Sequence, residues 1–463
     1  MSSVKTLVFA VIAIALGLYI YIVERPKLEA EGTEDRLVAL DATAVRGLRL
    51  AYPDSDTIVV ERGDDGWRML EPIETGADDG AVTRLIEQVA SAKAERRISG
   101  DDAHDLATYG LAGDGERARI SVELDDGTKL QDIIVGRTTP VGYQAFARVD
   151  GSPDVVVTPL IFHTGVKKTT FELRDKRLFR FADDAVAGVE IGSPDGTLTL
   201  TRDGERWRLG GPVDDRADTN QVKTLVSSLT NLQALAFYDP AEVNDTATGL
   251  AEPRLEVMLA IEGEEAVGFR LGERIAEAPA GYYMERRPDG QLAKVPEWVA
   301  TRFAAAPAAL RDKHLFDCSA NDIARMSFER ADGDAFALVR GDDDAWAIEP
   351  ARDGKVKRGV VTRRRNGLAT LAGTDIVAEN VTDADALAQY GLAPPAVTVE
   401  LQLGDGTVCG KAMAGVVGLD AGSPAYYFRR DGDDTIMSVA EYLYSRMDAV
   451  AEDFFEPAAP PGS

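Results

Sequence analysis

A heptapeptide that occurs twice places the strongest constraint on this sequence. Leu-Arg-Asp-Lys-Arg-Leu-Phe at residues 173–179 returns as Leu-Arg-Asp-Lys-His-Leu-Phe at residues 310–316, 137 positions later. Trp67, Trp207 and Trp346 keep nearly the same spacing, 140 and 139 positions, and each lies in a short run that leads to a proline. Recurrence at this distance indicates duplication of a whole domain. The sequence therefore predicts three tandem copies, and the heptapeptide marks where one copy ends and the next begins.

The copies and their flanks divide the chain into successive segments. These are a cytoplasmic head at 1–5, a transmembrane anchor at 6–23, a tether at 24–36, repeat domains at 37–176, 177–314 and 315–456, and a disordered tail at 457–463. A chain of 463 residues accommodates about three domains of ordinary size. A period of this length exceeds the roughly 20–50 residues of solenoid repeats, so we expect each copy to have a core of its own.

Each copy shows the same order of hydrophobic patterns. Short strands with turns come first, and a helix follows, with Asp78 and Asp218 placed to cap it in the first two copies. Its buried stripe is expected at Val82, Leu85, Ile86 and Val89, and at Val222, Leu225, Val226, Leu229 and Leu232. Alternating strands then follow a Gly-Leu landmark at Gly110, Gly249 and Gly391. The predicted fold class is α+β, with one N-terminal transmembrane helix and three tandem repeats of an antiparallel-sheet-plus-helices domain.

The N-terminal segment predicts membrane insertion. Residues 6–23 contain 18 residues without a charge, and as a helix they would span roughly 27 Å, close to the thickness of a bilayer core. The following residues lack the small-residue pattern of a signal-peptide cleavage site. We therefore expect a single-pass protein of the inner (cytoplasmic) membrane, with residues 24–463 outside the cytoplasm.

Charge and catalytic motifs narrow the possible functions. The net charge of −27 argues against nucleic-acid binding. The three histidines, His104, His163 and His314, fall at different places in the copies, and no nucleophile, metal-protease or phosphate-loop motif occurs. We expect no enzymatic activity, no cofactor and no metal site.

The two cysteines leave two interpretations open. Cys318 and Cys409 align with apolar residues of another copy, Phe181 and Leu130. Buried free thiols are the favoured interpretation, and a disulfide acquired by the third copy is the alternative.

These landmarks together resemble the bacterial domain of unknown function (DUF) 4340 family, over about residues 36–456. The resemblance rests on the tryptophan strands, the Gly-Leu sites, the tyrosine-rich strands and the Leu-Arg-Asp-Lys motif. The third copy departs from the pattern, because its end reads Ser-Arg-Met-Asp at 445–448 and Asp-Phe-Phe at 453–455. Members of this family are often encoded beside ABC-transporter subunits, so the resemblance implies an accessory role in the cell envelope and supplies no catalytic residues.

Two functions from different classes follow as expectations. The first is a membrane-tethered extracytoplasmic accessory, scaffold or binding subunit of an ABC-transport assembly, with a permease or auxiliary subunit as partner. The alternative is an envelope protein that binds a small ligand or lipid between repeats, without a transporter. A deep apolar groove would favour the alternative.

A basic segment at residues 352–365 is the candidate partner-binding site. It contains Arg352, Lys355, Lys357, Arg358, Arg363, Arg364 and Arg365 on an otherwise acidic chain, and it predicts docking of an acidic partner or anionic lipid. Alignment of the copies places Arg364 and Arg365 opposite Leu225 and Val226, which are expected to face the core. The competing interpretation is an ordinary solvated helix face.

Overall fold

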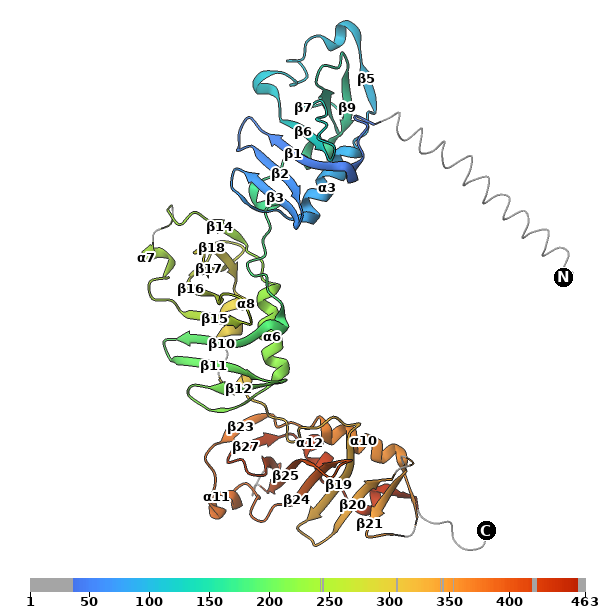
Figure 1. Ribbon diagram of the computed structural model, residues 1–463, viewed down its shortest axis with the longest axis vertical. Coiled ribbons are helices and arrows are strands. Elements are labelled where there is room, and N and C mark those ends of the chain that lie inside the picture. Colours follow the sequence, from blue (N-terminus) through green and yellow to red (C-terminus); the bar gives the residue numbers. More distant parts are fainter. Residues whose placement is uncertain are drawn as a thin grey trace, which may run out of the picture.

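The structure, a computed structural model, describes residues 36–456 apart from residues 242, 244, 305, 306, 342, 344, 353 and 419–422. This part of the chain folds as three units in series, each an antiparallel sheet with helices packed against it (Figure 1). We refer to them as repeat 1, repeat 2 and repeat 3, for residues 37–176, 177–314 and 315–456.

The sheet of repeat 1 has the strand order β4-β3-β2-β1-β6-β7-β8-β9-β5. Its strands are β1 (Val45–Ala51), β2 (Ile58–Gly63), β3 (Gly66–Glu71), β4 (Thr75–Gly76), β5 (Arg96–Ile98), β6 (Ala118–Leu124), β7 (Ile133–Thr138), β8 (Gln144–Val149) and β9 (Val155–Pro159). Its helices are α3 (Asp79–Ala90), α4 (Leu160–Gly165) and α5 (Thr170–Leu173).

Repeat 2 has the same topology, in the order β13-β12-β11-β10-β15-β16-β17-β18-β14. Its strands are β10 (Val186–Ser193), β11 (Gly196–Asp203), β12 (Arg206–Gly210), β13 (Asp215–Ala217), β14 (Ala236–Tyr238), β15 (Leu255–Ile261), β16 (Val267–Ile275), β17 (Gly281–Arg287) and β18 (Leu292–Pro296). Its helices are α6 (Thr219–Thr230), α7 (Asp245–Thr248), α8 (Trp298–Phe303) and α9 (Pro307–Leu310).

Repeat 3 follows the order β21-β20-β19-β24-β25-β26-β27-β23, and β22 pairs separately with β28. Its strands are β19 (Ile323–Arg330), β20 (Ala335–Arg340), β21 (Trp346–Glu349), β22 (Lys355–Val356), β23 (Asp375–Ala378), β24 (Val397–Leu403), β25 (Val408–Val417), β26 (Ala425–Arg430), β27 (Ile436–Val439) and β28 (Phe455–Glu456). Its helices are α10 (Arg358–Ala369), α11 (Ala384–Ala388) and α12 (Glu441–Met447). Short 3-10 helices lie at Ala42–Ala44, Gly100–Ala103, Gly113–Gly115, Asp183–Ala185 and Ala451–Phe454.

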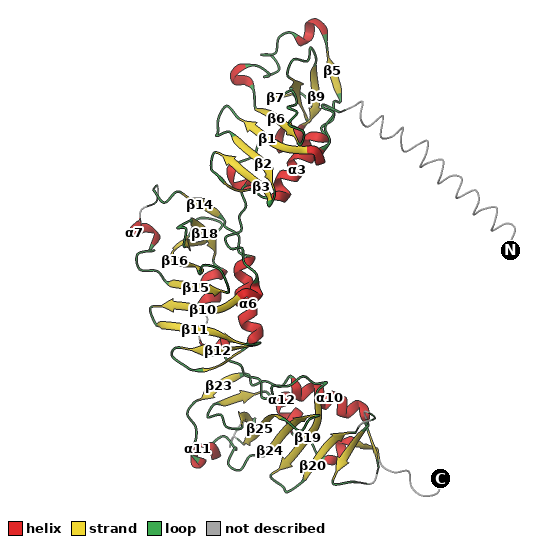
Figure 2. Ribbon diagram, in the orientation of Figure 1, coloured by secondary structure: helices red, strands yellow, loops and turns green. Residues whose placement is uncertain are grey.

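Hydrophobic alternation explains how each sheet acquires one buried face. In β15, Leu255, Val257, Leu259 and Ile261 are buried and the residues between them are more exposed, as the period of two predicts. The long helices α3 and α6 cover that face (Figure 2), and the predicted stripes of both helices are buried. Asp78 and Asp218 accept hydrogen bonds from the first turns of these helices, so the predicted caps are confirmed.

The Gly-Leu landmark marks a close crossing of two backbone segments. Gly110, Gly249 and Gly391 all have φ between 65° and 67°, in the left-handed region that favours glycine. A Cβ on Gly391 would lie 2.6 Å from the Val416 carbonyl oxygen and 2.8 Å from its amide nitrogen. The same backbone approach in every repeat explains why a glycine recurs there.

The repeated heptapeptide belongs to two repeats at once. At the second copy, Arg311 bridges to Ala217 of repeat 2, and three residues later His314 bridges to Ala372 of repeat 3. At the first copy, Arg174 bridges to Ala77, and Arg177 bridges to Gln233. Because the segment pairs with both adjacent repeats within four residues, the linker between the two repeats is short. Repeat 3 ends differently. Val356 stands where the earlier repeats have Ala77 and Ala217, and its pairing partner is Phe455 instead of the arginine of the heptapeptide.

Cys318 and Cys409 form a disulfide within repeat 3, with their Cα atoms 5.7 Å apart. The favoured interpretation of free thiols is therefore wrong. The bond joins the segment entering repeat 3 to β25 and closes a loop with a sequence separation of 91 residues. A disulfide of that span typically contributes roughly 2–4 kcal/mol by restricting the unfolded chain.

The fold class expected from the sequence needs correction. Antiparallel sheet predominates over helix in every repeat, because most of each repeat follows the period of two and only one long helix interrupts it. No helix within residues 36–456, as far as they are described, is long and apolar enough to cross a membrane. The anchor expected at 6–23 lies outside the described residues. The expected single-pass location in the inner membrane is therefore not supported.

The repeated tryptophans pack in the hydrophobic cores of their repeats. Trp67 and Trp207 are each 5% exposed, and Trp346 is partly buried against the core of repeat 3. The repeated tyrosines are less uniform. Tyr282, Tyr283, Tyr426 and Tyr427 are partly buried, whereas Tyr143 is 87% exposed.

Replacement of Trp207 by alanine is expected to lower the free energy of unfolding of repeat 2 by about 3–5 kcal/mol, because it leaves a large cavity in the core. Trp298→Ala is the matched control. Its side chain in the same repeat is largely outside the core, and we expect a loss of about 1 kcal/mol or less. Urea unfolding of the full chain, followed by circular dichroism, measures both. Equal losses for the two variants would contradict the core assignment of Trp207.

Candidate functional site

The basic segment at 352–365 lies in the loop before β22, in β22 and in α10. Helices α6 and α10 have bounds that differ by the same 139 positions at each end, so Arg364 and Arg365 do stand where Leu225 and Val226 stand in repeat 2. Helix α10 buries only Val361 and Leu368. The two arginines therefore interrupt the apolar stripe that the other repeats use.

Arg364 is a structural residue of repeat 3. Its guanidinium donates hydrogen bonds of 2.6 Å to the carbonyl oxygens of Ser445 and Arg446, at the end of α12. Its stem passes Phe454, with the guanidinium carbon 5.8 Å from the ring centroid. These carbonyls have no partner within their own helix. Burial lowers the pKa of Arg364, and the nearby Asp453 and Asp448 oppose that shift. Arg364 thus fixes α10 to α12.

Several other basic side chains of the segment also bind their own repeat. Arg352 forms ion pairs of 2.9 Å with Asp334 and 2.8 Å with Glu452. Lys357 donates to the carbonyl oxygen of Asp453, and Arg365 donates to the Asn321 side chain. Lys355, Arg358 and Arg363 are exposed. Docking of an acidic partner or of anionic lipid at this segment therefore remains a prediction.

The junction between repeats 2 and 3 contains the most buried charge cluster of the described chain. Arg311, from the second heptapeptide, has a side chain only 5% exposed. It binds Asp215 of repeat 2 at 2.6 Å, and Glu379 and Thr435 of repeat 3. Arg430 of repeat 3 lies 3.8 Å from the same Asp215 carboxylate. One arginine thus holds side chains from both repeats.

A histidine–aspartate pair lies beside this cluster. The Nδ1 atom of His314 is 2.7 Å from Asp312. The hydrogen bond to Asp312 raises the pKa of His314 above its ordinary value, although partial burial opposes the shift. Burial would raise the pKa of Asp312, but its hydrogen bonds with His314 hold that pKa below the ordinary value. His104 and His163 lie in repeat 1 and do not converge with this pair.

The junction between repeats 1 and 2 uses the same position with weaker partners. Arg174 donates a hydrogen bond of 2.7 Å to Gln291, and its guanidinium carbon lies 3.5 Å from the centroid of the Phe237 ring. Arg286 of repeat 2 donates to the carbonyl oxygen of Leu178. The heptapeptide therefore joins successive repeats at both ends of repeat 2, with the buried ion pairs only at the second junction.

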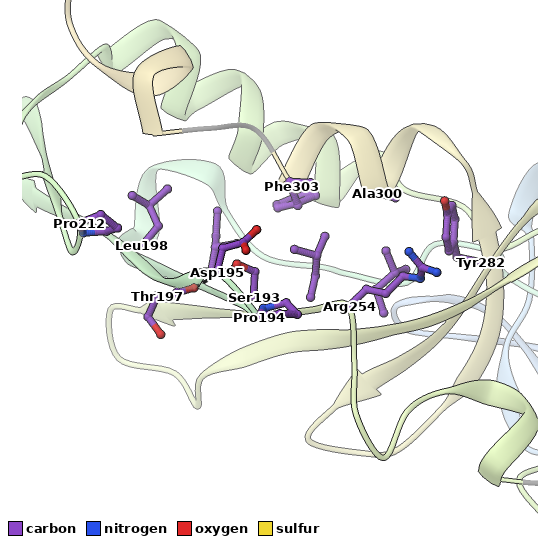
Figure 3. Close-up of a pocket in the computed structure, with 15 residues that line it drawn as sticks. Ser193, Pro194, Asp195, Thr197, Leu198, Pro212, Arg254, Tyr282, Ala300 and Phe303 are labelled. Carbon is purple, nitrogen blue, oxygen red and sulfur yellow. Dashed lines mark hydrogen bonds between the residues drawn. The ribbon is translucent and has the colours of Figure 1, made fainter. Parts of the chain in front are cut away.

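A cavity of about 600 Å³ opens in repeat 2 between the sheet and α8 (Figure 3). Leu255 and Leu271 line it from the sheet, and Phe303 lines it from the helix. Arg254 and Tyr282 lie at one end, away from Leu198 and Pro212 (Figure 3). The alternative function foresaw a groove between repeats, whereas this cavity lies within one repeat.

Sequence reasoning missed the partners of Arg311 and the cavity. Asp215, Glu379 and Thr435 come from three segments far apart in sequence, and no local pattern connects them. The sequence contains a signal for the cavity. Alignment of the copies places the small Ser193 where repeat 1 has the large Tyr52.

Replacement of Arg311 by methionine is expected to lower the free energy of unfolding across the 2–3 junction by about 3 kcal/mol, because the Asp215 carboxylate is left buried with incomplete compensation. Arg208→Met is the matched control, since its ion pair with Asp214 is exposed and we expect a change below about 1 kcal/mol. Urea unfolding of the full chain measures both. A loss for Arg311→Met no larger than that of the control would contradict the junction assignment.

Comparisons with solved structures give only a remote likeness. A DNA polymerase III β subunit (sliding clamp) from Pseudomonas aeruginosa, bound to griselimycin, is 9% identical, with 88% of this chain and 94% of that chain covered and a TM-score of 0.16. The β subunit from Borrelia burgdorferi, in complex with a natural product, is 8% identical, with coverage of 92% and 87% and a TM-score of 0.14. TM-scores this low carry no argument about fold or function.

A search of curated proteins found no match. A family profile matches residues 67–253 and 246–363, which is more than half of the chain. On that match, the protein belongs to the family described as "Domain of unknown function (DUF4340)".

Proposed function

We propose that this protein is a non-enzymatic scaffold subunit of an ABC-transport assembly, in which its three repeats present equivalent contact points to partner proteins. The choice of an ABC-transport assembly rests on what the family resemblance implies. The choice of a scaffold rests on one structural observation, the recurrence of an exposed apolar side chain at the same place in each repeat.

That side chain lies on the helix that directly follows β9, β18 or β27, which we call the closing helix of the repeat. Ile161 of α4 is 74% exposed, Trp298 of α8 is 40% exposed, and Tyr442 of α12 is 66% exposed. Each lies five residues before a buried residue that anchors the helix, namely Val166, Phe303 and Met447. A single exposed apolar residue is ordinary. Its recurrence at the equivalent position of three repeats supports a role in contacts, because aromatic and large apolar side chains are the common anchors of protein interfaces.

The junctions support this proposal because they fix the spacing of the three contact points. Arg311 binds side chains of repeats 2 and 3, and Arg174 joins repeats 1 and 2 through Gln291. Contact points held at defined separations can engage one partner together, which strengthens binding beyond that of each contact alone.

Site-specific photocrosslinking in cells that naturally make this protein tests the proposal. A photoreactive residue at position 161, 298 or 442 is expected to crosslink to a permease, ATPase or auxiliary subunit of an ABC transporter, identified by mass spectrometry. Position 143 is the control, because Tyr143 is more exposed than any of the three test residues but does not lie on a closing helix. Crosslinks only to proteins outside such an assembly, or the same products from position 143, would contradict the proposal.

The triple variant Ile161→Ser, Trp298→Ser, Tyr442→Ser gives a second readout. We expect the affinity for the partner identified by crosslinking to fall about tenfold or more, because large apolar anchors are lost. The free energy of unfolding is expected to change by about 1 kcal/mol or less per site, because these side chains lie largely on the surface.

A further inference from the structure

The cavity of repeat 2 lies at a position that the other two repeats fill. The residues at this position are Tyr52 in repeat 1, Ser193 in repeat 2 and Arg330 in repeat 3. Each follows by two residues a strand residue that pairs with equivalent partners on both neighbouring strands in all three repeats. Those residues are Leu50 (paired with Ile58 and Ile120), Ile191 (with Leu198 and Val257) and Phe328 (with Phe336 and Val399).

In repeat 1, Tyr52 closes the space between the sheet and the segment after α4. Its hydroxyl donates a hydrogen bond of 2.9 Å to the Val166 carbonyl oxygen and accepts one of 3.0 Å from the Lys168 amide. The side chain is buried, and burial raises the pKa of Tyr52 to about 12. The ring therefore occupies interior space in repeat 1.

In repeat 3, larger side chains fill the corresponding space. Arg330 reaches across to an ion pair with Asp448, directly after α12. Phe328 and Phe336 stack with ring centroids 4.8 Å apart, and Phe454 contacts both rings. The sheet and the closing helix are again joined by side chains.

Repeat 2 has Ser193 where repeat 1 has Tyr52 and repeat 3 has Arg330, and it has Leu198 where repeat 3 has Phe336. A cavity of about 600 Å³ that is open to solvent therefore lies where the other two repeats place these larger side chains. Its volume lies within the roughly 300–1,000 Å³ of small-molecule sites.

The walls of the cavity match an amphiphile with one charged end. Leu255, Leu271 and Phe303 are 4%, 0% and 2% exposed and lie behind the surface of the cavity, and its accessible apolar wall includes Pro212, Ala300 and Ala304. Arg254 stands at one end with its side chain half exposed, 3.3 Å from Glu273, so its remaining donors can reach a ligand. Asp195 lies in the turn between β10 and β11, apart from Arg254 (Figure 3), and its charge disfavours an anion there.

We propose that this cavity binds a single-chain amphiphile with a terminal carboxylate, of the medium-chain fatty-acid class. The acyl chain lies along the accessible apolar wall at Pro212, Ala300 and Ala304, and the carboxylate meets the planar guanidinium of Arg254, which suits carboxylates. This binding activity goes beyond the scaffold role and does not depend on it, because none of these residues belongs to the proposed contact points.

Titration calorimetry of the full chain with sodium decanoate tests the proposal. We expect saturable binding at one site, and about fourfold tighter binding for each methylene added from hexanoate to decanoate, as the burial of one CH₂ group predicts. Absence of saturable binding, or affinity independent of chain length, would overturn the proposal.

Ser193→Tyr reproduces in repeat 2 the side chain that fills repeat 1. It is expected to weaken decanoate binding at least tenfold while the melting temperature stays the same or rises. Ser55→Tyr, in the exposed turn after β1 of repeat 1, is the matched control and is expected to bind like the native chain. Native affinity in a folded Ser193→Tyr variant would show that decanoate binds elsewhere.

Arg254→Gln separates the carboxylate contact from the apolar cavity, and it decides the question alone if Ser193→Tyr does not fold. We expect about tenfold weaker binding of decanoate and unchanged binding of decanol. Arg208→Gln, which removes an equally exposed arginine of the same repeat, is expected to change neither. Unchanged decanoate affinity in Arg254→Gln would refute the assigned carboxylate site.

Discussion

The Leu-Arg-Asp-Lys segment must satisfy two repeats within a few residues, and the arrangement of the described chain depends on this. Its backbone pairs with the turn before the long helix of one repeat and then with the segment after the long helix of the next. At the second junction the same segment brings Arg311 into a buried site with Asp215 and Glu379. Removal of one partner from such a cluster is costly, because it leaves a charge without compensation. The repeats are therefore joined by specific contacts rather than by a flexible linker.

Differences between equivalent positions show where the repeats have diverged. Ser193 opens a cavity where Tyr52 closes one. Arg364 stands where Leu225 belongs to the core, and its guanidinium donates hydrogen bonds to carbonyl oxygens at the end of α12. In a duplicated fold, each residue can be compared with the residues at the equivalent positions of the other repeats, which show what the shared fold needs there. What departs from that requirement is a candidate for function.

Much of the repeat could be read from the sequence, because its signals are local. The period of two predicted the buried face of β15, and the stripes of α3 and α6 followed the helical period. The partners of Arg311 could not be read, because Asp215, Glu379 and Thr435 meet only through tertiary packing. The disulfide was left open for the same reason, since the distance between Cys318 and Cys409 depends on where β25 lies.

The central claim is that the junction fixes the relative placement of repeats 2 and 3. Spin labels on Lys223→Cys of α6 and Asn366→Cys of α10 occupy exposed positions on the long helices of the two repeats. The distance between them can be measured by double electron–electron resonance in the full chain with the native disulfide intact. This account predicts one narrow distance distribution. A broad distribution, of the kind that a flexible linker between independent domains produces, would contradict it.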